Sequence, residues 1–195
     1  MKSKRIILEN IKKANVPSVP LPSLEMKHAN YEDKNLKFKD MLQSVGGVAS
    51  WLETGNSIED FIQENYGNLG EIATNMDISL KRTKTNDIDD PHSLKDVDLA
   101  IIKGEFAVAE NGAVWVKEDD NQNRAIYFIA RKLLIIVPKN NIVDSMHEAY
   151  KKIDFSKGGF GTFISGPSKT ADIEQALVIG AHGAMECRVL FTDLL

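Results

Sequence analysis

Short apolar runs that alternate with helical stripes constrain the fold of this chain more than any other feature of its sequence. The run from Leu133 to Val137 is nearly unbroken, which is typical of a strand buried on both faces of a sheet. Between Ile142 and Ile153 the apolar residues recur at helical spacing, so we predict a helix there. Strands that alternate with helices indicate an α/β fold with a mostly parallel sheet flanked by helices.

The same two patterns predict the other elements of this fold. Ser57-Ile-Glu-Asp60 resembles a capping box, which would begin a helix with its apolar residues on one face. Gly46 and Gly47 are expected to end the helix before it. Further strands are predicted at 48–52, 71–74, 98–102, 107–109, 113–116, 160–164 and 187–192, and further helices at 3–14, 36–45, 58–66 and 171–177.

Length and proline content predict one domain behind an N-terminal arm. A chain of 195 residues with 43% hydrophobic residues can bury one sizeable core, which we place at 31–195. Residues 1–30 would form an amphipathic helix followed by a linker, because three prolines between 15 and 25 resist helix formation. The arm could dock on a partner subunit, or it could be a mobile tail.

Charge and cysteine content exclude several classes of protein. The net charge is -4, and the lysines are scattered among acidic residues, which argues against a nucleic-acid surface. Cys187 is the only cysteine, so a self-contained four-cysteine cluster or zinc site is excluded, and we expect a buried thiol. No apolar run approaches the roughly 18 residues that cross a bilayer, and the N-terminus lacks the apolar core of a signal peptide. A cytoplasmic protein without membrane or nucleic-acid partners is predicted.

A polar segment between the strand at 160–164 and the helix at 171–177 is the strongest candidate for a binding site. A helix N-terminus carries unpaired N–H groups and favours an anion, so we expect a small carboxylate or phosphate-bearing metabolite there. Glycine would allow close backbone approach, proline would stiffen the turn, and the hydroxyls and lysine would donate. The alternative is that Ser168 or Thr170 caps the helix, with Asp172 and Glu174 complementing its dipole. The predicted ligand-binding residues are Ser165, Gly166, Pro167, Ser168, Lys169, Thr170 and Asp172, the last of which would orient the loop.

A second candidate is the loop at Ala109-Glu-Asn-Gly112, which follows a predicted strand. Ligands collect beyond the carboxyl ends of strands in such folds. Apolar runs on both sides of Glu110 suggest a partly buried carboxylate, whose raised pKa would suit catalysis of proton transfer. The alternative, which we favour, is a β-hairpin turn with Asn111 and Gly112 at the positions that need positive φ. Asn111 and Gly112 are also candidate ligand contacts.

His182 lies in a third small-residue segment, Gly180-Ala-His-Gly183. It could transfer a proton near neutral pH, or it could be a turn residue bonded to the backbone. Gly183 is a further candidate ligand contact. No second histidine or cysteine clusters with His182 in the sequence, so we expect no metal site.

The segments 106–114, 164–174 and 180–183 together closely resemble the LUD domain and, more narrowly, the lactate utilisation protein C group. The resemblance covers roughly residues 98–195. It implies a fold similar to the NagB/RpiA/CoA-transferase group. It also implies a role, with two iron–sulfur partner proteins, in oxidising L-lactate to pyruvate. The clusters would lie in those partners, with no cofactor in this chain.

Two departures from the family pattern leave alternatives open. The family usually has Glu-Thr-Gly where this chain has Glu110-Asn111-Gly112, which is closer to the Glu-Asn-Gly segment of class I CoA transferases, where the glutamate is a nucleophile. Ala184 stands where family members often have proline, so the loop would be less rigid. We prefer an accessory or ligand-binding subunit over a CoA-transferase-like or isomerase-like enzyme using Glu110, and over a module that senses a small anion.

Overall fold

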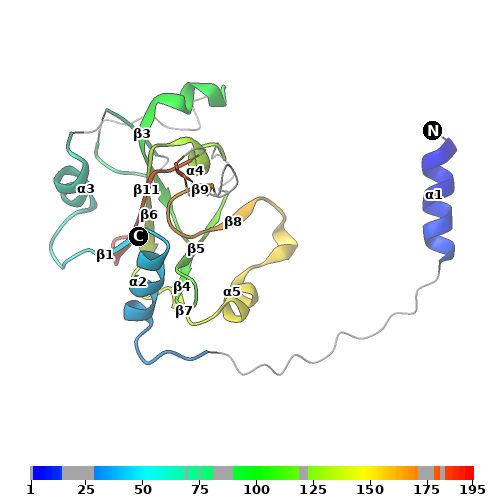
Figure 1. Ribbon diagram of the computed structural model, residues 1–195, viewed down its shortest axis with the longest axis horizontal. Helices are drawn as coiled ribbons and strands as arrows, with labels where there is room; N and C mark the ends of the chain where they lie inside the picture. Colours follow the sequence, from blue (N-terminus) through cyan, green and yellow to red (C-terminus); the bar gives the residue numbers. More distant parts are fainter. Residues whose placement is uncertain are drawn as a thin grey trace.

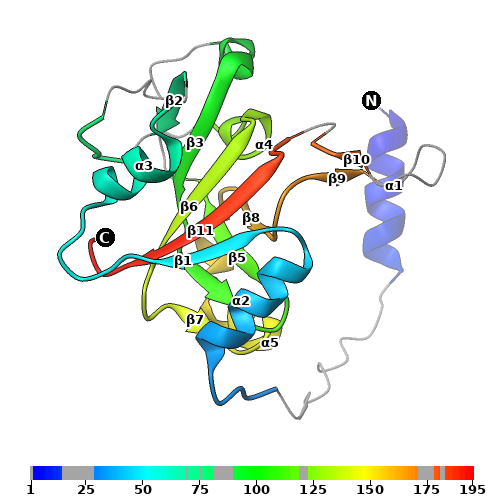
Figure 2. The ribbon, with the colours of Figure 1, turned by 60° about the vertical axis from the view of Figure 1, so that its left-hand side comes forward.

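Two sheets packed face to face form the body of the molecule (Figure 1). The computed structural model describes residues 2–14, 29–68, 70–74, 76–80, 90–118, 123–170, 178–180 and 183–195. The first sheet, called the parallel sheet, has the strand order β1 (Val48–Trp51), β11 (Glu186–Thr192), β6 (Lys132–Pro138), β3 (Val97–Lys103) and β2 (Glu71–Thr74). All of its neighbouring strands run parallel, as Figure 2 shows. The predicted α/β class with a mostly parallel sheet is confirmed.

The second sheet, called the mixed sheet, was not predicted as a separate layer. Its strand order is β7 (Ile142–Val143), β4 (Phe106–Val108), β5 (Ala113–Lys117) and β8 (Gly161–Ile164). β5 runs antiparallel to β4 and to β8, whereas β7 runs parallel to β4. A short pair, β9 (Lys169–Thr170) with β10 (Val178–Ile179), stands beside these sheets.

Alternate residues of the parallel-sheet strands pack into two different hydrophobic cores, one on each face of the sheet. In β3, Leu99 and Ile101 pack into the cluster that includes α3 (Ile58–Tyr66). Ala100 and Ile102 pack into the cluster shared with the mixed sheet. Successive side chains of a strand point to opposite faces, so a strand covered on both sides must be apolar at every position. This explains the unbroken apolar runs.

Helices pack on the outer faces of both sheets and also into the core between them. α2 (Lys34–Ser44) buries Phe38 and Leu42 in the core shared by the two sheets. There the rings of Phe38 and Phe191 pack edge-on, with their centroids 5.2 Å apart. α5 (Met146–Lys152) covers the mixed sheet with Ala149. The described residues also form the shorter helices α4 (Ile126–Ile129), η2 (Pro91–Asp96) and η3 (Phe155–Lys157).

The termini of the helices test the sequence predictions. The Ser57 capping box is confirmed, because the Ser57 hydroxyl accepts from the Asp60 N–H and the Asp60 carboxylate accepts from the Ser57 N–H. The single helix predicted from Ile142 to Ile153 is wrong at its beginning. Ile142 pairs with Ala107 as part of β7, and α5 begins only at Met146. The helix predicted at 171–177 lies outside the described residues.

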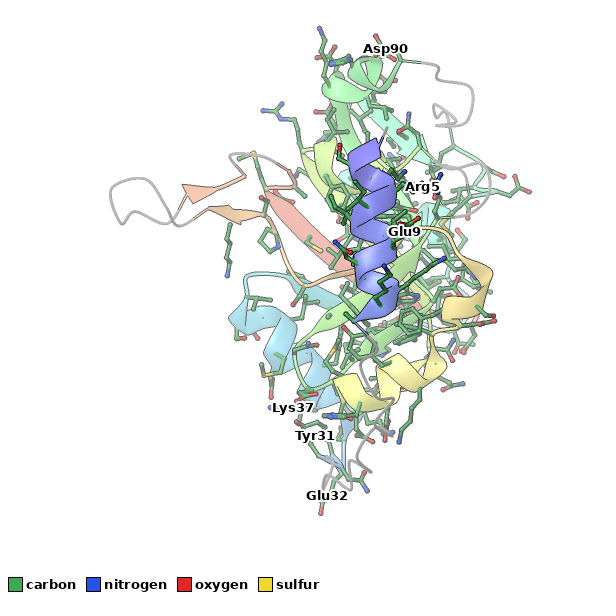
Figure 3. The ribbon with its side chains drawn as sticks, turned by 90° about the vertical axis from the view of Figure 1, so that its right-hand side faces the viewer. Arg5, Glu9, Tyr31, Glu32, Lys37 and Asp90 are labelled. Atoms are coloured by element: carbon green, nitrogen blue, oxygen red, sulfur yellow. The ribbon has the colours of Figure 1, made fainter. Side chains whose placement is uncertain are left out.

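The N-terminal helix α1 (Lys2–Lys13) confirms the predicted amphipathic helix and stands apart from the sheets (Figure 1). Ile7 is 58% exposed and Ile11 is 64% exposed, so its apolar side chains face solvent. Arg5 and Glu9, labelled in Figure 3, form an exposed ion pair one turn apart at 3.1 Å. The predicted linker lies outside the described residues. Among the helices that are described, none has the length and apolar content needed to span a bilayer.

Candidate functional site

The hairpin that joins β4 to β5 contains Glu110, Asn111 and Gly112. Val108 pairs with Ala113 across it. The Gly112 N–H donates to the Val108 carbonyl over 3.0 Å, and the Ala113 N–H donates to Asn111 Oδ1 over 3.1 Å. The predicted hairpin is therefore confirmed, although its loop runs from 109 to 112 and is longer than a two-residue Asn-Gly turn.

Gly112 lies directly against the backbone of α2. Its φ is +66°, in the left-handed region that favours glycine. A Cβ at this position would lie 2.6 Å from the Leu42 nitrogen and 2.8 Å from Leu42 Cα. Conformation and packing each call for glycine here, independently of any ligand.

Glu110 is exposed, so the partial burial expected for it is wrong. Its Oε2 accepts a hydrogen bond of 2.8 Å from the N–H of Met146, the first residue of α5. Its own N–H donates to the Asp144 carbonyl over 3.0 Å. A carboxylate is favoured at the positive end of a helix, so this contact stabilises the start of α5. In this arrangement Glu110 acts as a helix cap supplied from a neighbouring hairpin.

Asp144 is a buried carboxylate that the sequence reasoning missed. Its Oδ1 accepts from the Tyr31 N–H over 3.1 Å, and its Oδ2 lies 2.8 Å from Lys34 Nζ. Tyr31, labelled in Figure 3, lies just before α2. Lys37 Nζ lies 5.2 Å from the centre of the Tyr31 ring, in a cation–π contact. The available signal was Asp144-Ser145 ahead of Glu148, a pattern typical of a helix start. Asp144, just before α5, thus contacts residues just before and at the start of α2.

Ser165, Gly166 and Pro167 bring the predicted binding segment against this hairpin. Ser165 Oγ donates to the Asn111 carbonyl over 2.9 Å. Gly166 is buried, and a Cβ there would lie 2.8 Å from the Val45 carbonyl oxygen at the end of α2. Pro167 is also buried. The two loops singled out in the sequence thus meet beside the carboxyl end of α2, while Ser165 itself stays exposed.

Ser168 joins this segment to the Gly183 loop. The Ser168 N–H donates to the Ala184 carbonyl over 2.8 Å, and the Ser168 carbonyl accepts from the Gly180 N–H over 3.0 Å. A Cβ at Gly183 would lie 3.1 Å from the Phe128 carbonyl oxygen and 3.2 Å from Ser168 Cβ. Three segments that were singled out separately in the sequence are therefore neighbours.

Lys169 and Thr170 form strand β9, in which Lys169 pairs with Ile179 and Thr170 with Val178. Lys169 is exposed, and its Cε would lie 3.9 Å from a Cβ placed on Gly46, just beyond the end of α2. A cation is favoured at that end of a helix, so Lys169 has a structural role available besides the predicted anion contact. Asp172 and His182 lie outside the described residues, as does the helix N-terminus on which the anion prediction depended.

Cys187 is buried under this loop region, as predicted. Burial raises the pKa of its thiol to about 12, although a backbone hydrogen bond from Gly166 acts in the opposite direction. The thiol is therefore neutral near pH 7 and a poor nucleophile or metal ligand. Within the described ranges, no three His, Cys, Asp or Glu side chains are grouped so as to hold a metal ion.

The parallel sheet, the mixed sheet and the three converging loops define a two-sheet protein of the α/β class. Residues 36–192 match the LUD domain, and the chain belongs to the LUD domain family. The fold is similar to the crystal structure of a DUF162 family protein from Deinococcus radiodurans, with a TM-score of 0.65. That similarity covers 81% of this chain and 95% of the other at 15% sequence identity, so it bears on the fold alone.

Among individual proteins, the chain is similar to several named lactate utilization protein C. It is 37% identical over 103 residues to the protein of Geobacillus kaustophilus, which takes in 49% of this chain and 43% of that one. The Oceanobacillus iheyensis protein is 33% identical over 102 residues, covering 49% and 44%. The Shouchella clausii protein is 29% identical over 133 residues, covering 64% and 56%. The chain thus spans about half the length of the curated relatives it matches.

Proposed function

We propose that this chain is an accessory or ligand-binding subunit of a cytoplasmic iron–sulfur system that oxidises L-lactate to pyruvate. The observation that carries the proposal is family membership together with relatives named lactate utilization protein C. Cys187 is the only cysteine, so a four-cysteine cluster would need thiolates from other chains. Electrons would therefore pass through partner subunits.

The proposed ligand is a small carboxylate such as lactate or pyruvate, bound where the three loops meet. Ser165, bonded to the hairpin carbonyl of Asn111, supports this placement, since it fixes the segment beside Glu110 and Gly112. The exposed ammonium group of Lys169 supplies positive charge two residues beyond the buried Pro167. A lysine attracts a carboxylate as a point charge, so its removal should weaken binding.

Titration calorimetry with lactate, pyruvate, CoA and a sugar phosphate tests this site. We expect saturable binding of a carboxylate to the wild type and at least about tenfold weaker binding to Lys169→Ala, which corresponds to about 1.4 kcal/mol. Lys95→Ala, on η2, is the matched control because it removes an exposed lysine from a different element. Equal affinity in Lys169→Ala and wild type would remove the proposed contact.

The N-terminal helix α1 is the surface we propose for an iron–sulfur partner. It presents exposed isoleucine and leucine side chains that no other described element covers, at positions 6, 7, 8 and 11. An amphipathic helix commonly lays such a face into an apolar groove of a partner. In co-purification with the iron–sulfur subunits, the double variant Ile7→Glu, Ile11→Glu should lose the complex. Leu36→Glu, which changes an equally exposed apolar residue on α2, should retain it.

Activity of the isolated chain separates this proposal from an independent enzyme. We expect no lactate dehydrogenation with an artificial electron acceptor until the partner subunits are added. A CoA-transferase or isomerase reaction using Glu110 would instead be lost in Glu110→Gln while the wild type alone is active. Robust turnover by the isolated chain would contradict the accessory role.

A further inference from the structure

A pocket of about 500 Å³ opens at the end of the mixed sheet that lies away from the hairpin loop. It is lined by Phe106 at the start of β4, by Trp115 and Lys117 of β5, and by Lys152 at the end of α5. From Gly112 to Lys117 the chain extends about 17 Å, so the pocket is separate from the site described above. Its volume is typical of pockets for small organic molecules.

Two ammonium groups border this pocket. Lys117 Nζ lies 3.4 Å from Glu105 Oε2, and the Lys117 side chain is 51% exposed. Close charged pairs approach to about 2.7–2.9 Å, so this ion pair is loose and can be shared with another anion. Lys152 Nζ lies 5.2 Å from the centre of the Phe106 ring, held over its face by a cation–π contact. An anion bound beside both ammonium groups would be attracted to them, while the carboxylates of Glu105 and Asp154, which also line the pocket, restrict where it can lie.

Aromatic rings and glycines make up much of the remaining lining, which also contains Glu105, Asn141, Ile153 and Asp154. Trp115, Phe155 and Phe160 all line it, and the Phe155 side chain is 67% exposed, so its ring is accessible from the pocket. At Gly158 and Gly159, a Cβ would meet no atom within 4 Å, so the loop leaves open space there. Aromatic faces beside open space suit a flat ring, because offset or edge-on stacking buries its apolar surface.

We propose that this pocket binds a planar ring that carries a carboxylate or a phosphate. The ring lies among Trp115, Phe155 and Phe160, and the anion contacts Lys117 and Lys152. A wholly apolar ligand would displace water from the two ammonium groups without bonding to them, while an anion without a ring would leave the aromatic walls in water. The pocket would thus select for both halves of the ligand together.

Fluorescence of Trp115 provides a direct readout of this pocket. The chain has two tryptophans, and Trp51 lies elsewhere, stacked on Phe191. In a Trp51→Phe background, adenosine monophosphate and phenylpyruvate are titrated against Trp115, with adenosine and inorganic phosphate as the separate halves. We expect saturable quenching by at least one ring-bearing anion, and binding at least about tenfold weaker for each half alone. Which of the two ring-bearing anions binds more tightly distinguishes a phosphate ligand from a carboxylate ligand.

Lysine variants connect that signal to the proposed contacts. Lys117→Ala and Lys152→Ala should each weaken binding several-fold, whereas Lys151→Ala, the preceding exposed residue of α5, should not. Calorimetry on chains that retain Trp51 repeats the comparison. Lys169→Ala should leave this affinity unchanged, so failure here is distinguishable from failure of the lactate-site proposal. The inference is overturned if neither ring-bearing anion saturates the signal, if adenosine binds as tightly as its monophosphate, or if Lys151→Ala weakens binding as much as the two pocket variants.

Discussion

Replacing Gly112 by alanine should destabilise the fold strongly, because two independent penalties act at this position. A non-glycine residue at φ +66° costs about 1–2 kcal/mol. The added Cβ would also lie 2.6 Å from the backbone nitrogen of Leu42, and relieving such a contact in a packed region costs about 1–3 kcal/mol. We therefore expect the free energy of unfolding to fall by about 2–5 kcal/mol in total.

Gly55→Ala is the matched control for this experiment. Gly55 has φ +96°, but a Cβ there would meet no atom within 4 Å, so only the conformational penalty applies. Alanine also lowers the entropy of the unfolded chain, and this effect is the same at both positions. Because φ +96° lies farther than φ +66° from the left-handed minimum near about +57°, an excess loss in Gly112→Ala is a lower bound on the cost of the contact between the hairpin and α2.

Urea denaturation of the wild type and the two variants measures these changes, provided that the denaturant slopes agree. Thermal unfolding should show the same order, with about 2–4 °C lost per kcal/mol for a chain of this size. If Gly112→Ala and Gly55→Ala lose the same free energy of unfolding, the close approach of α2 does not constrain the hairpin, and the steric reasoning fails.

Three further outcomes follow from single contacts. Glu110→Ala should cost about 1 kcal/mol by removing the cap on α5, while Glu110→Gln, which keeps an acceptor oxygen, should cost less; equal losses in urea titrations would argue against the capping bond. Lys34→Ala should lower the free energy of unfolding by about 1–2 kcal/mol, because it leaves the carboxylate of Asp144 buried without its cation. The expected loss is smaller than for a fully buried pair because the Lys34 side chain is 41% exposed. Unchanged stability would contradict this pairing. Burial raises the pKa of the Cys187 thiol from 9.0 to about 12, so the stability that the neutral thiol contributes below pH 9 should be lost as the pH rises toward 12. A disulfide reagent should not label this thiol in the native protein at pH 8. Rapid labelling there would refute its burial.

The strands of the parallel sheet could be predicted because each pattern is local. β6 is covered on both faces, so every residue from Leu133 to Val137 is apolar and the run stands out. The wrong boundary of α5 arose because Ile142 and Val143 fit helical spacing, although they pair with β4. Ser145, whose hydroxyl accepts from the Glu148 N–H, marks the true start, and this local signal was overlooked.

The candidate site was predictable only in part, since its geometry depends on contacts between distant segments. Ser165 meets the hairpin beyond the carboxyl ends of β8 and β4 in the mixed sheet, whereas the strand-end rule used in the sequence refers to the parallel sheet. The burial of Asp144 could not be read from its polar neighbours, because Tyr31 and Lys34 reach it from over a hundred positions away. Likewise, apolar runs around Glu110 belong to strands that turn away from it, which leaves the carboxylate exposed.

The position of β11 between β1 and β6 has a consequence for biosynthesis. Val48 of β1 pairs with Arg188 of β11, so β1 is synthesised well before the strand with which it pairs. Until β11 is synthesised, the backbone edge of β1 is unpaired. Such an edge can bind chaperones or associate with another nascent chain. Pairing across such a separation is also slow, so we expect refolding from denaturant to be limited by closure of this gap.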